Sequence, residues 1–198
     1  MPDAGRVIAG SAGGLRLSAP GEGTRPFSDR VKQSLFAALE AGMGSAWPSP
    51  FLDLFAGSGA AGIEALSRGA PTVVFVEKDH KAVRVIGENL RRTSLIGGAV
   101  IVQRDALAYL SIGAEAADRY EGFGAVVIDP PYADTDALAA SLARLGDQSL
   151  GWLRDDAVVI AKHFWRDQPP ARAGILQLDH VKRFGETALS FYRVVTQP

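Results

Sequence analysis

The chain has 198 residues, 47% hydrophobic and 22% charged, a composition typical of one folded domain with a full hydrophobic core. It contains no cysteine, which excludes disulfides, thiolate catalysis and cysteine-based zinc sites, and its histidines are not spaced as metal ligands, so we expect no metal. The lack of an apolar run near the ~20 residues of a membrane span and the lack of a signal-peptide pattern predict a cytoplasmic protein with no membrane partner, and we expect a monomer. The net charge of −1 by itself argues against a nucleic-acid partner.

Two elements are predicted ahead of the first core strand. The segment from Arg6 to Gly23 is rich in glycine, and we expect a small hairpin or a flexible arm there. From Ser28 to about Glu40, apolar residues recur at helical spacing, with Ser28 as the expected N-cap and Lys32 outside the apolar face. We therefore predict a helix that covers a sheet through Val31, Leu35, Ala38 and Leu39.

The rest of the chain alternates short Val- and Ile-rich runs with helix-like stretches, which is typical of a parallel sheet covered by helices. The predicted strands are Phe51–Phe55, Val73–Val76, Ala99–Val102, Ala125–Ile128 and Ala157–Ala161, and the predicted helices are Gly62–Arg68, Lys81–Arg92 and Asp136–Leu145. A closing hairpin is expected from Gln177–Lys182 and Ala188–Val195 around the turn Phe184-Gly185-Glu186. The sequence thus predicts an α/β fold in one domain over 1–198, with an N-terminal arm and helix over 1–40 and a catalytic core over 51–195.

A glycine-rich turn joins the first core strand to the first core helix, and Gly57, Gly59 and Gly62 have the spacing of a dinucleotide-binding loop. Such glycines let the backbone turn sharply and a ligand approach closely, which suits NAD and a nucleoside methyl donor equally. Asp53, in the first strand, distinguishes the two ligands. Its carboxylate would repel the pyrophosphate of NAD, whereas it can pair with the ammonium of a methionine moiety. The loop therefore predicts S-adenosylmethionine as cofactor.

Two more acids follow the next two predicted strands. Glu77 comes directly after Val76, where a carboxylate can accept hydrogen bonds from both ribose hydroxyls. Asp105 and Ala106 follow the third strand, and Asp105 is expected to bind the exocyclic amine of adenine. Because ligands of open α/β sheets bind at the carboxyl ends of the strands, these acids predict one cofactor site.

The fourth predicted strand runs into Asp129-Pro130-Pro131-Tyr132. An exocyclic amine of a nucleobase must pyramidalise before it can attack a methyl group, and two acceptors on its hydrogens favour that change. The Asp129 carboxylate and the Pro130 carbonyl can supply them, because consecutive prolines fix the loop. Tyr132 can stack on a base that has left its helix or loop. The tetrapeptide thus predicts the catalytic site of an amino-methyltransferase.

The residues from Asp53 to Gly59, taken with Asp129 to Tyr132, resemble the class I amino-methyltransferases. The glycine-rich N-terminus, Thr24-Arg25-Pro26, Asp29-Arg30-Val31 and Ser34-Leu35-Phe36 further resemble the bacterial RsmD family, and this similarity runs from about Arg6 to Val195. One departure is Phe27-Ser28, where the family commonly has threonine after Arg-Pro.

The resemblance implies a Rossmann-like fold with a seven-stranded, mostly parallel sheet of order 3-2-1-4-5-7-6 and an antiparallel last strand. It also implies methylation of guanine N2 in 16S ribosomal RNA, with the N-terminal segment and its helix helping to hold cofactor and RNA.

Basic residues gather toward both ends of the chain. Residues 1–34 carry five basic and three acidic side chains, and residues 162–193 carry six and three. These segments are expected to contact the phosphates of 16S ribosomal RNA or of a small-subunit assembly intermediate. The candidate residues are Arg6, Arg16, Arg25, Lys182 and Arg183. Ordinary solvated faces remain the alternative interpretation of these charges.

Three other functions stay open at this point. The same chemistry can act on DNA adenine or on a protein glutamine, which Asp-Pro-Pro-Tyr does not exclude. A nicotinamide-dependent oxidoreductase is favoured by the glycine spacing alone and opposed by Asp53. A catalytically silent RNA-binding module is opposed by the presence of Asp129 and Tyr132.

Overall fold

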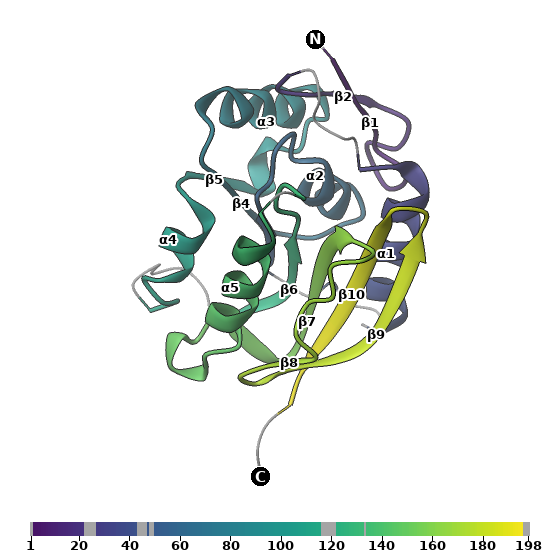
Figure 1. Cartoon of the computed structure of the whole chain (residues 1–198). Coiled ribbons are helices and arrows are strands. Elements are labelled where there is room, and N and C mark those ends of the chain that lie inside the picture. Colours follow the sequence, from purple (N-terminus) through teal and green to yellow (C-terminus); the bar gives the residue numbers. More distant parts are fainter. Residues whose placement is uncertain are drawn as a thin grey trace. The chain divides into compact units, whose positions relative to one another are not determined.

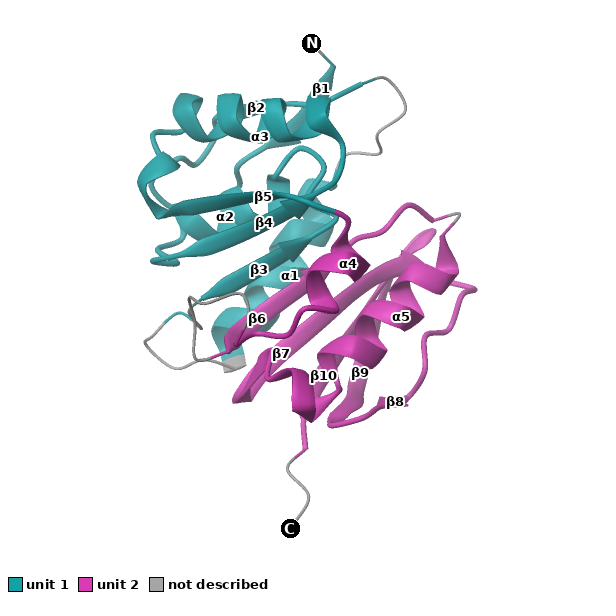
Figure 2. Cartoon of the chain, turned by 90° about the vertical axis from the view of Figure 1, so that its left-hand side faces the viewer, with its two compact units in different colours: residues 1–104 teal, residues 105–198 magenta. Residues whose placement is uncertain are grey.

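The computed structural model describes residues 2–21, 27–42, 47, 50–115, 122–132 and 134–195 (Figure 1). The chain divides into two compact units, unit 1 over Met1–Arg104 and unit 2 over Asp105–Pro198 (Figure 2). Both units combine helices with strands, which confirms the α/β class. A single domain over 1–198, with an arm over 1–40 and a core over 51–195, stays a prediction. None of the helices in the described part of the chain is long and apolar enough to cross a membrane.

Unit 1 contains a three-stranded parallel arrangement in the order β5-β4-β3. Its strands are β3 (Phe51–Leu54), β4 (Val73–Glu77) and β5 (Ala99–Gln103). All residues of β3 and the first four of β4 are buried, as expected for parallel strands covered on both faces. The observed strands match the predicted ones to within a residue at each end.

Two helices cover this sheet, and a side-chain cap in the local sequence begins the second of them. Helix α2 (Ala60–Ser67) packs on β3 and β4, and α3 (His80–Arg92) packs on β4 and β5. The Asp79 carboxylate accepts a hydrogen bond from the Ala82 N–H at 2.8 Å and so begins α3. A short 3-10 turn at Ile96–Gly98 leads into β5.

The N-terminal segment forms a hairpin, which is one of the two structures expected from the sequence; the other was a flexible arm. Strands β1 (Asp3–Arg6) and β2 (Arg16–Ser18) pair antiparallel and pack on α2 and α3. The buried Glu64 carboxylate of α2 accepts hydrogen bonds from the Ile8 and Ala9 N–H groups at 2.7 and 3.0 Å. This segment is thus held on the helix that follows the glycine loop.

Helix α1 (Asp29–Gly42) begins and ends within two residues of the predicted bounds. Ser28 Oγ accepts a hydrogen bond from the Val31 N–H at 3.4 Å, so the hydroxyl after Phe27 serves as the helix cap. The expectation for Lys32 was wrong, because its side chain is fully buried and its ammonium donates to the Arg6 carbonyl. Burial lowers the pKa of Lys32, against the opposing charge of Glu64.

Unit 2 contains a second set of strands, in the order β6-β7-β10-β9-β8. Strands β6 and β7 are parallel, whereas β10 runs antiparallel to both β7 and β9, which confirms the closing hairpin. The strands are β6 (Phe123–Ile128), β7 (Leu153–Phe164), β8 (Arg172–Ala173), β9 (Leu176–Phe184) and β10 (Thr187–Val194). Within each unit the neighbours agree with the corresponding part of the expected order; the order 3-2-1-4-5-7-6 for the whole sheet stays a prediction.

The helices of unit 2 are α4 (Ala106–Leu110) and α5 (Thr135–Leu145), which pack against each other. Asp134 Oδ1 accepts from the Ala137 N–H at 3.0 Å and caps α5. Sequence periodicity did not predict α4, because five residues are too few to show a helical repeat. The 3-10 turn Gln148–Leu150 and the strand β8 were also missed, because segments of three and two residues are too short to show any periodicity.

Candidate functional site

The glycine loop of unit 1 leaves β3 and enters α2 through three residues in the left-handed region, of which Phe55, with φ 59°, is not a glycine. Gly57 has φ 56° and Gly59 has φ 77°, a conformation that other residues rarely adopt. Gly62 is required for a different reason, since a Cβ there would lie 2.2 Å from Cε1 of Phe75 on β4. The third glycine therefore lets α2 pack closely on the sheet, as in nucleotide-binding loops.

Asp53 holds this loop in place. Its side chain is buried, and Oδ2 accepts a hydrogen bond from the Gly62 N–H at 2.9 Å. The carboxylate thereby binds an N–H in the first turn of α2, where helices leave their N–H groups without internal partners. The contact with a methionine ammonium, expected from the sequence, stays a prediction.

Glu77, the last residue of β4, bridges two loops. Its Oε2 accepts from the Gly57 N–H at 2.8 Å and its Oε1 accepts from the Asp79 N–H at 2.8 Å. Each carboxylate oxygen has a second lone pair, so the group is fixed in position and can still accept from ribose hydroxyls. The buried Asn89 of α3 adds a further tie, donating to the carbonyls of Ser58 and Ser18 at 2.9 Å. Sequence reasoning missed Asn89, because its partners are 31 and 71 residues away.

Asp105 and Ala106 open unit 2. Asp105 is exposed, and its Oδ1 accepts from the N–H groups of Leu107 and Ala108, both at 3.0 Å, while Ala106 is buried in the first turn of α4. Asp105 thus acts as the N-cap of α4. The expected hydrogen bond from this carboxylate to adenine stays a prediction, as does the role of Ala106.

The Asp-Pro-Pro-Tyr loop follows β6, whose residues are all buried. Asp129 Oδ1 lies 2.5 Å from the Nζ of Lys162, on the neighbouring strand β7. Burial raises the pKa of the Asp129 carboxyl, and the Lys162 ammonium acts in the opposite direction. Sequence reasoning missed Lys162. The parallel register, with Ile128 opposite Ala161, is what brings it beside Asp129.

The rest of the loop is anchored to the same strands. Pro130 is buried and Pro131 is exposed. The Tyr132 hydroxyl is hydrogen-bonded to Thr187 Oγ1 of β10 at 2.8 Å, and Lys162 Nζ lies 5.2 Å from the Tyr132 ring centroid. The aromatic ring is therefore held at its hydroxyl end, with a cation near its face.

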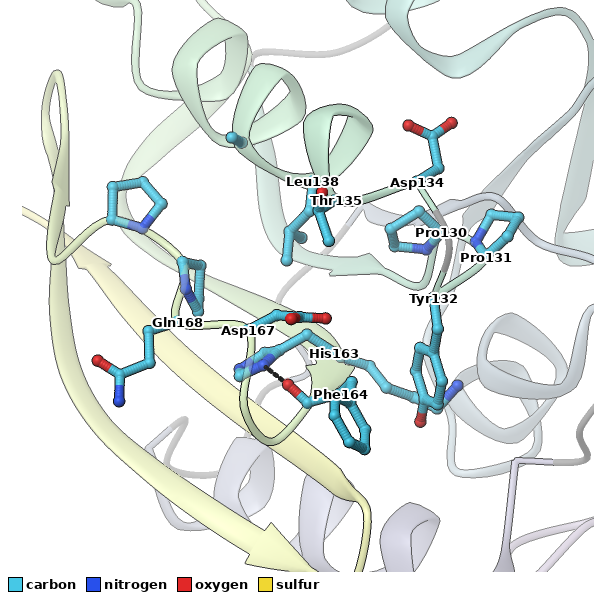
Figure 3. Close-up of a pocket in the computed structure, with 14 residues that line it drawn as sticks. Pro130, Pro131, Tyr132, Asp134, Thr135, Leu138, His163, Phe164, Asp167 and Gln168 are labelled. Carbon is cyan, nitrogen blue, oxygen red and sulfur yellow. Dashed lines mark hydrogen bonds between the residues drawn. The ribbon is translucent and has the colours of Figure 1, made fainter.

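A pocket of about 460 Å³, partly open to solvent, adjoins this loop within unit 2 (Figure 3). Prolines and tyrosine of the loop form one side, Thr135 and Leu138 of α5 another, and the turn after β7 the remainder. The lining includes Pro130, Pro131, Tyr132, His163, Phe164, Asp167 and Gln168. The two ring nitrogens of His163 are hydrogen-bonded to the Phe164 carbonyl and to Ser190 Oγ, each at 2.8 Å, which fixes the ring in position.

The basic residues proposed for RNA contact have different surroundings. Arg6 pairs with Asp29 at 2.9 Å, and Arg16 pairs with Asp3. Arg25 lies outside the described residues. Lys182 and Arg183 are both exposed on β9, but neighbouring residues of a strand point to opposite faces of a sheet. The role of these residues in RNA contact stays a prediction. Among the described residues, no cluster of acidic and histidine side chains is arranged to hold a metal ion.

Comparison with known proteins supports the family resemblance that the sequence motifs indicated. The family model described as Conserved hypothetical protein 95 matches residues 5–193. The chain is 36% identical to the YlbH protein of Bacillus subtilis, over 95% of this chain and 98% of that protein. It is 32% identical to the Ribosomal RNA small subunit methyltransferase D of Escherichia coli, over 95% of this chain and 89% of that enzyme.

Solved structures give the same result. The yhhF protein of Escherichia coli matches with a TM-score of 0.79 and 30% identity, over 97% of this chain and 98% of that one. A hypothetical protein of Thermus thermophilus matches with a TM-score of 0.78 and 34% identity, over 96% of this chain and 99% of that one. The chain therefore belongs to the Conserved hypothetical protein 95 family, the RsmD methyltransferase family that its motifs resemble.

Proposed function

We propose that this protein transfers a methyl group from S-adenosylmethionine to the exocyclic N2 of a guanine in 16S ribosomal RNA, free or in an assembling small subunit. The observation that carries the proposal is the Asp129–Lys162 pair at the start of the Asp-Pro-Pro-Tyr loop, in a chain 32% identical to a small-subunit ribosomal RNA methyltransferase. Family membership also favours the methyl donor over the nicotinamide cofactor that the glycine spacing allowed.

The glycine loop and Glu77 fit S-adenosylmethionine as ligand. Among the residues that the structure describes, a Cβ on Gly57 would meet only the Phe55 carbonyl, at 3.9 Å, so this part of the loop offers room for a ligand to approach the backbone. Glu77 is half-buried and fixed by two N–H groups, which suits a ribose diol. In this assignment Asp53 pairs with the methionine ammonium, and Gly57, Gly59, Asp105 and Ala106 complete the cofactor contacts. When bound, S-adenosylmethionine supplies a methyl group made electrophilic by its sulfonium.

Asp129 has two oxygens, and the proposal gives each a role. Oδ1 stays with Lys162, which favours the ionised carboxylate in a partly buried position. Oδ2 accepts one N–H of the guanine amine and the Pro130 carbonyl accepts the other, so the nitrogen lone pair turns out of the ring plane. Tyr132, held through its hydroxyl by Thr187, stacks on the base. As the N–C bond forms and the methyl–sulfur bond breaks, the nitrogen becomes acidic, and its proton leaves to Asp129 or to water.

The test is methyl transfer from labelled S-adenosylmethionine to small subunits purified from cells lacking guanine-N2 methylation, followed by nucleoside analysis. Duplex DNA and total protein serve as alternative acceptors. Label in N2-methylguanosine supports the proposal. Label in DNA adenine or in a protein glutamine would keep the chemistry and overturn the acceptor.

A further inference from the structure

The turn after β7 packs against the tip of the β9–β10 hairpin. The Trp165 N–H donates to the Glu186 carbonyl at 3.0 Å, and the Asp167 N–H donates to the Phe164 carbonyl at 3.0 Å. On the hairpin side, Arg183 Nε donates to the Gly185 carbonyl at 2.9 Å. Hydrogen bonds between main-chain groups therefore fix the turn, and a hydrogen bond to a main-chain carbonyl fixes the Arg183 guanidinium at its Nε.

Two guanidinium groups lie against the Trp165 ring. The Arg183 Cζ is 3.5 Å from the ring centroid, a stacking distance, and the Arg166 Cζ is 5.1 Å from it. Trp165 is half-buried, whereas both arginines are exposed. Neither arginine forms an ion pair with a carboxylate in the part of the chain that the structure describes. Their charge is thus available to a partner, and Arg183 is already ordered in a flat position.

This cluster adjoins the catalytic pocket. The Trp165 ring lies 6.3 Å from the Phe164 ring, which lies 6.4 Å from the Tyr132 ring, measured between centroids. Phe164 and Asp167 line the pocket beside Tyr132 (Figure 3), and Trp165 and Arg166 lie between them in the chain. A row of aromatic rings therefore leads from the Asp-Pro-Pro-Tyr loop to Arg183.

We propose that Arg183, held flat on Trp165 with Arg166 beside it, is a platform that binds the unpaired nucleotides flanking the target guanine. The proposal rests on the proposed function, since it names how that RNA is held. A guanidinium plane stacks on a nucleobase, and its N–H edges donate to phosphate oxygens. Asp167 and Glu186 lie in the same turns, so an excess of positive charge is not what distinguishes this surface. Its distinguishing feature is the preordered guanidinium plane, which loses little side-chain freedom on binding.

The experiment compares Arg183→Gln with Arg172→Gln. Arg172 is a matched control, because it is also exposed in unit 2 and its Nε donates to the carbonyl two residues along, that of Gly174, at 3.3 Å. Methyl transfer is measured against the concentration of small subunits lacking guanine-N2 methylation. Arg183→Gln is expected to raise the KM for subunits roughly ten-fold, the effect of losing one stacked base, with kcat unchanged. The salt dependence of log affinity should also fall by about 0.7, the value for one phosphate contact to a single strand.

A second variant, Arg183→Lys, separates stacking from charge. Lysine keeps the charge and lacks the plane, so its KM should lie between those of the wild type and Arg183→Gln, and its salt dependence should be that of the wild type. A wild-type KM for Arg183→Gln, or an equal rise for Arg172→Gln, would overturn the platform.

Thermal unfolding and S-adenosylmethionine binding of each variant are measured alongside the kinetics, because a contact that only fastens the hairpin would change the unfolding temperature and leave the KM alone. If the wild type methylates no subunits, the proposed function has failed. The platform is then judged by co-sedimentation of the same variants with the same subunits, where equal binding by Arg183→Gln and wild type overturns it.

Discussion

The acids assigned to the cofactor in unit 1 and the acid assigned to the chemistry in unit 2 are held by different kinds of partner. In unit 1, Asp53 and Glu77 accept hydrogen bonds from backbone N–H groups of the loops that they join. In unit 2, Asp129 is paired with a side-chain ammonium, that of Lys162, in a position where burial disfavours its charge. The first arrangement fixes the shape of a loop, whereas the second sets the charge of one carboxylate. This difference matches the proposed roles, in which Asp53 and Glu77 bind the cofactor and Asp129 takes part in the chemistry.

The largest effect is expected from Asp129→Asn. The amide keeps the shape of the side chain and one acceptor oxygen, but it loses the negative charge that strengthens the hydrogen bond to the amine, and it can no longer take the proton. We expect kcat to fall on the order of 10²–10³-fold, the cost of one catalytic hydrogen-bonding group. Steady-state methyl transfer measures this. Loss of cofactor affinity to the same extent would contradict the assignment of Asp129 to the chemical step.

Glu77→Ala tests the cofactor contact proposed for unit 1. The change removes the acceptor for the Gly57 and Asp79 N–H groups together with the group assigned to the ribose. S-adenosylmethionine affinity should fall roughly 10- to 100-fold, because hydrogen bonds to a charged group contribute about 1.5–3 kcal/mol. Calorimetric titration gives the value, and Glu88→Ala on the nearby helix α3 provides a control of equal charge. An unchanged dissociation constant would exclude Glu77 from the cofactor site.

Lys162→Met tests, through the pH dependence of kcat, whether Lys162 controls the charge of Asp129. Burial raises the pKa of Asp129 and Lys162 opposes that rise, so removing the ammonium raises this pKa further. The ionised form is then lost at a higher pH, and the acidic limb of the kcat profile should move toward alkaline pH. Below the new pKa, activity falls about ten-fold per pH unit.

Lys162→Arg, which keeps the charge, should return the acidic limb toward that of the wild type. A limb that does not move in Lys162→Met would mean that Lys162 does not control the charge of Asp129.

The smallest effect on turnover is expected from Gly62→Ala, which tests the packing of unit 1. The added Cβ would lie 2.2 Å from Cε1 of the buried Phe75, so the helix or the ring must shift. We expect a loss of about 1–3 kcal/mol in the free energy of unfolding, measured by chemical denaturation. Gly97→Ala is the control, because nothing lies within 4 Å of a Cβ there. Equal stability of the two variants would contradict the space requirement at Gly62.

The elements and the motifs that bear on function could be predicted because their determinants are local. A buried run such as Val73–Val76, the cap at Ser28 and the loop after Ile128 depend on neighbours within a few residues. The partners of the functional groups could not be predicted in this way. Lys162 is 33 residues from Asp129, and Asn89 is 71 residues from Ser18. Lys32 was misjudged because helical periodicity does not show that a carbonyl from another segment accepts its ammonium.

The roles of the cofactor residues illustrate the same limit. Asp53, Glu77 and Asp105 were selected because acids end successive strands, and the structure shows each bound to backbone N–H groups. An acid at the end of a predicted strand therefore has two interpretations: its carboxylate can bind backbone N–H groups of the next loop, or it can bind a ligand. For Glu77 both can hold, because each oxygen accepts more than one hydrogen bond.

The most direct test of the separate roles of Glu77 and Asp129 is the rate of a single turnover on small subunits lacking guanine-N2 methylation. The rate is measured as the concentration of S-adenosylmethionine is raised to saturation. The account predicts that Glu77→Ala approaches the wild-type rate at saturation, because only its capture of the cofactor is impaired. It predicts that Asp129→Asn stays slow at every concentration. A slow Glu77→Ala at saturation, or an Asp129→Asn that recovers with added cofactor, would contradict the account.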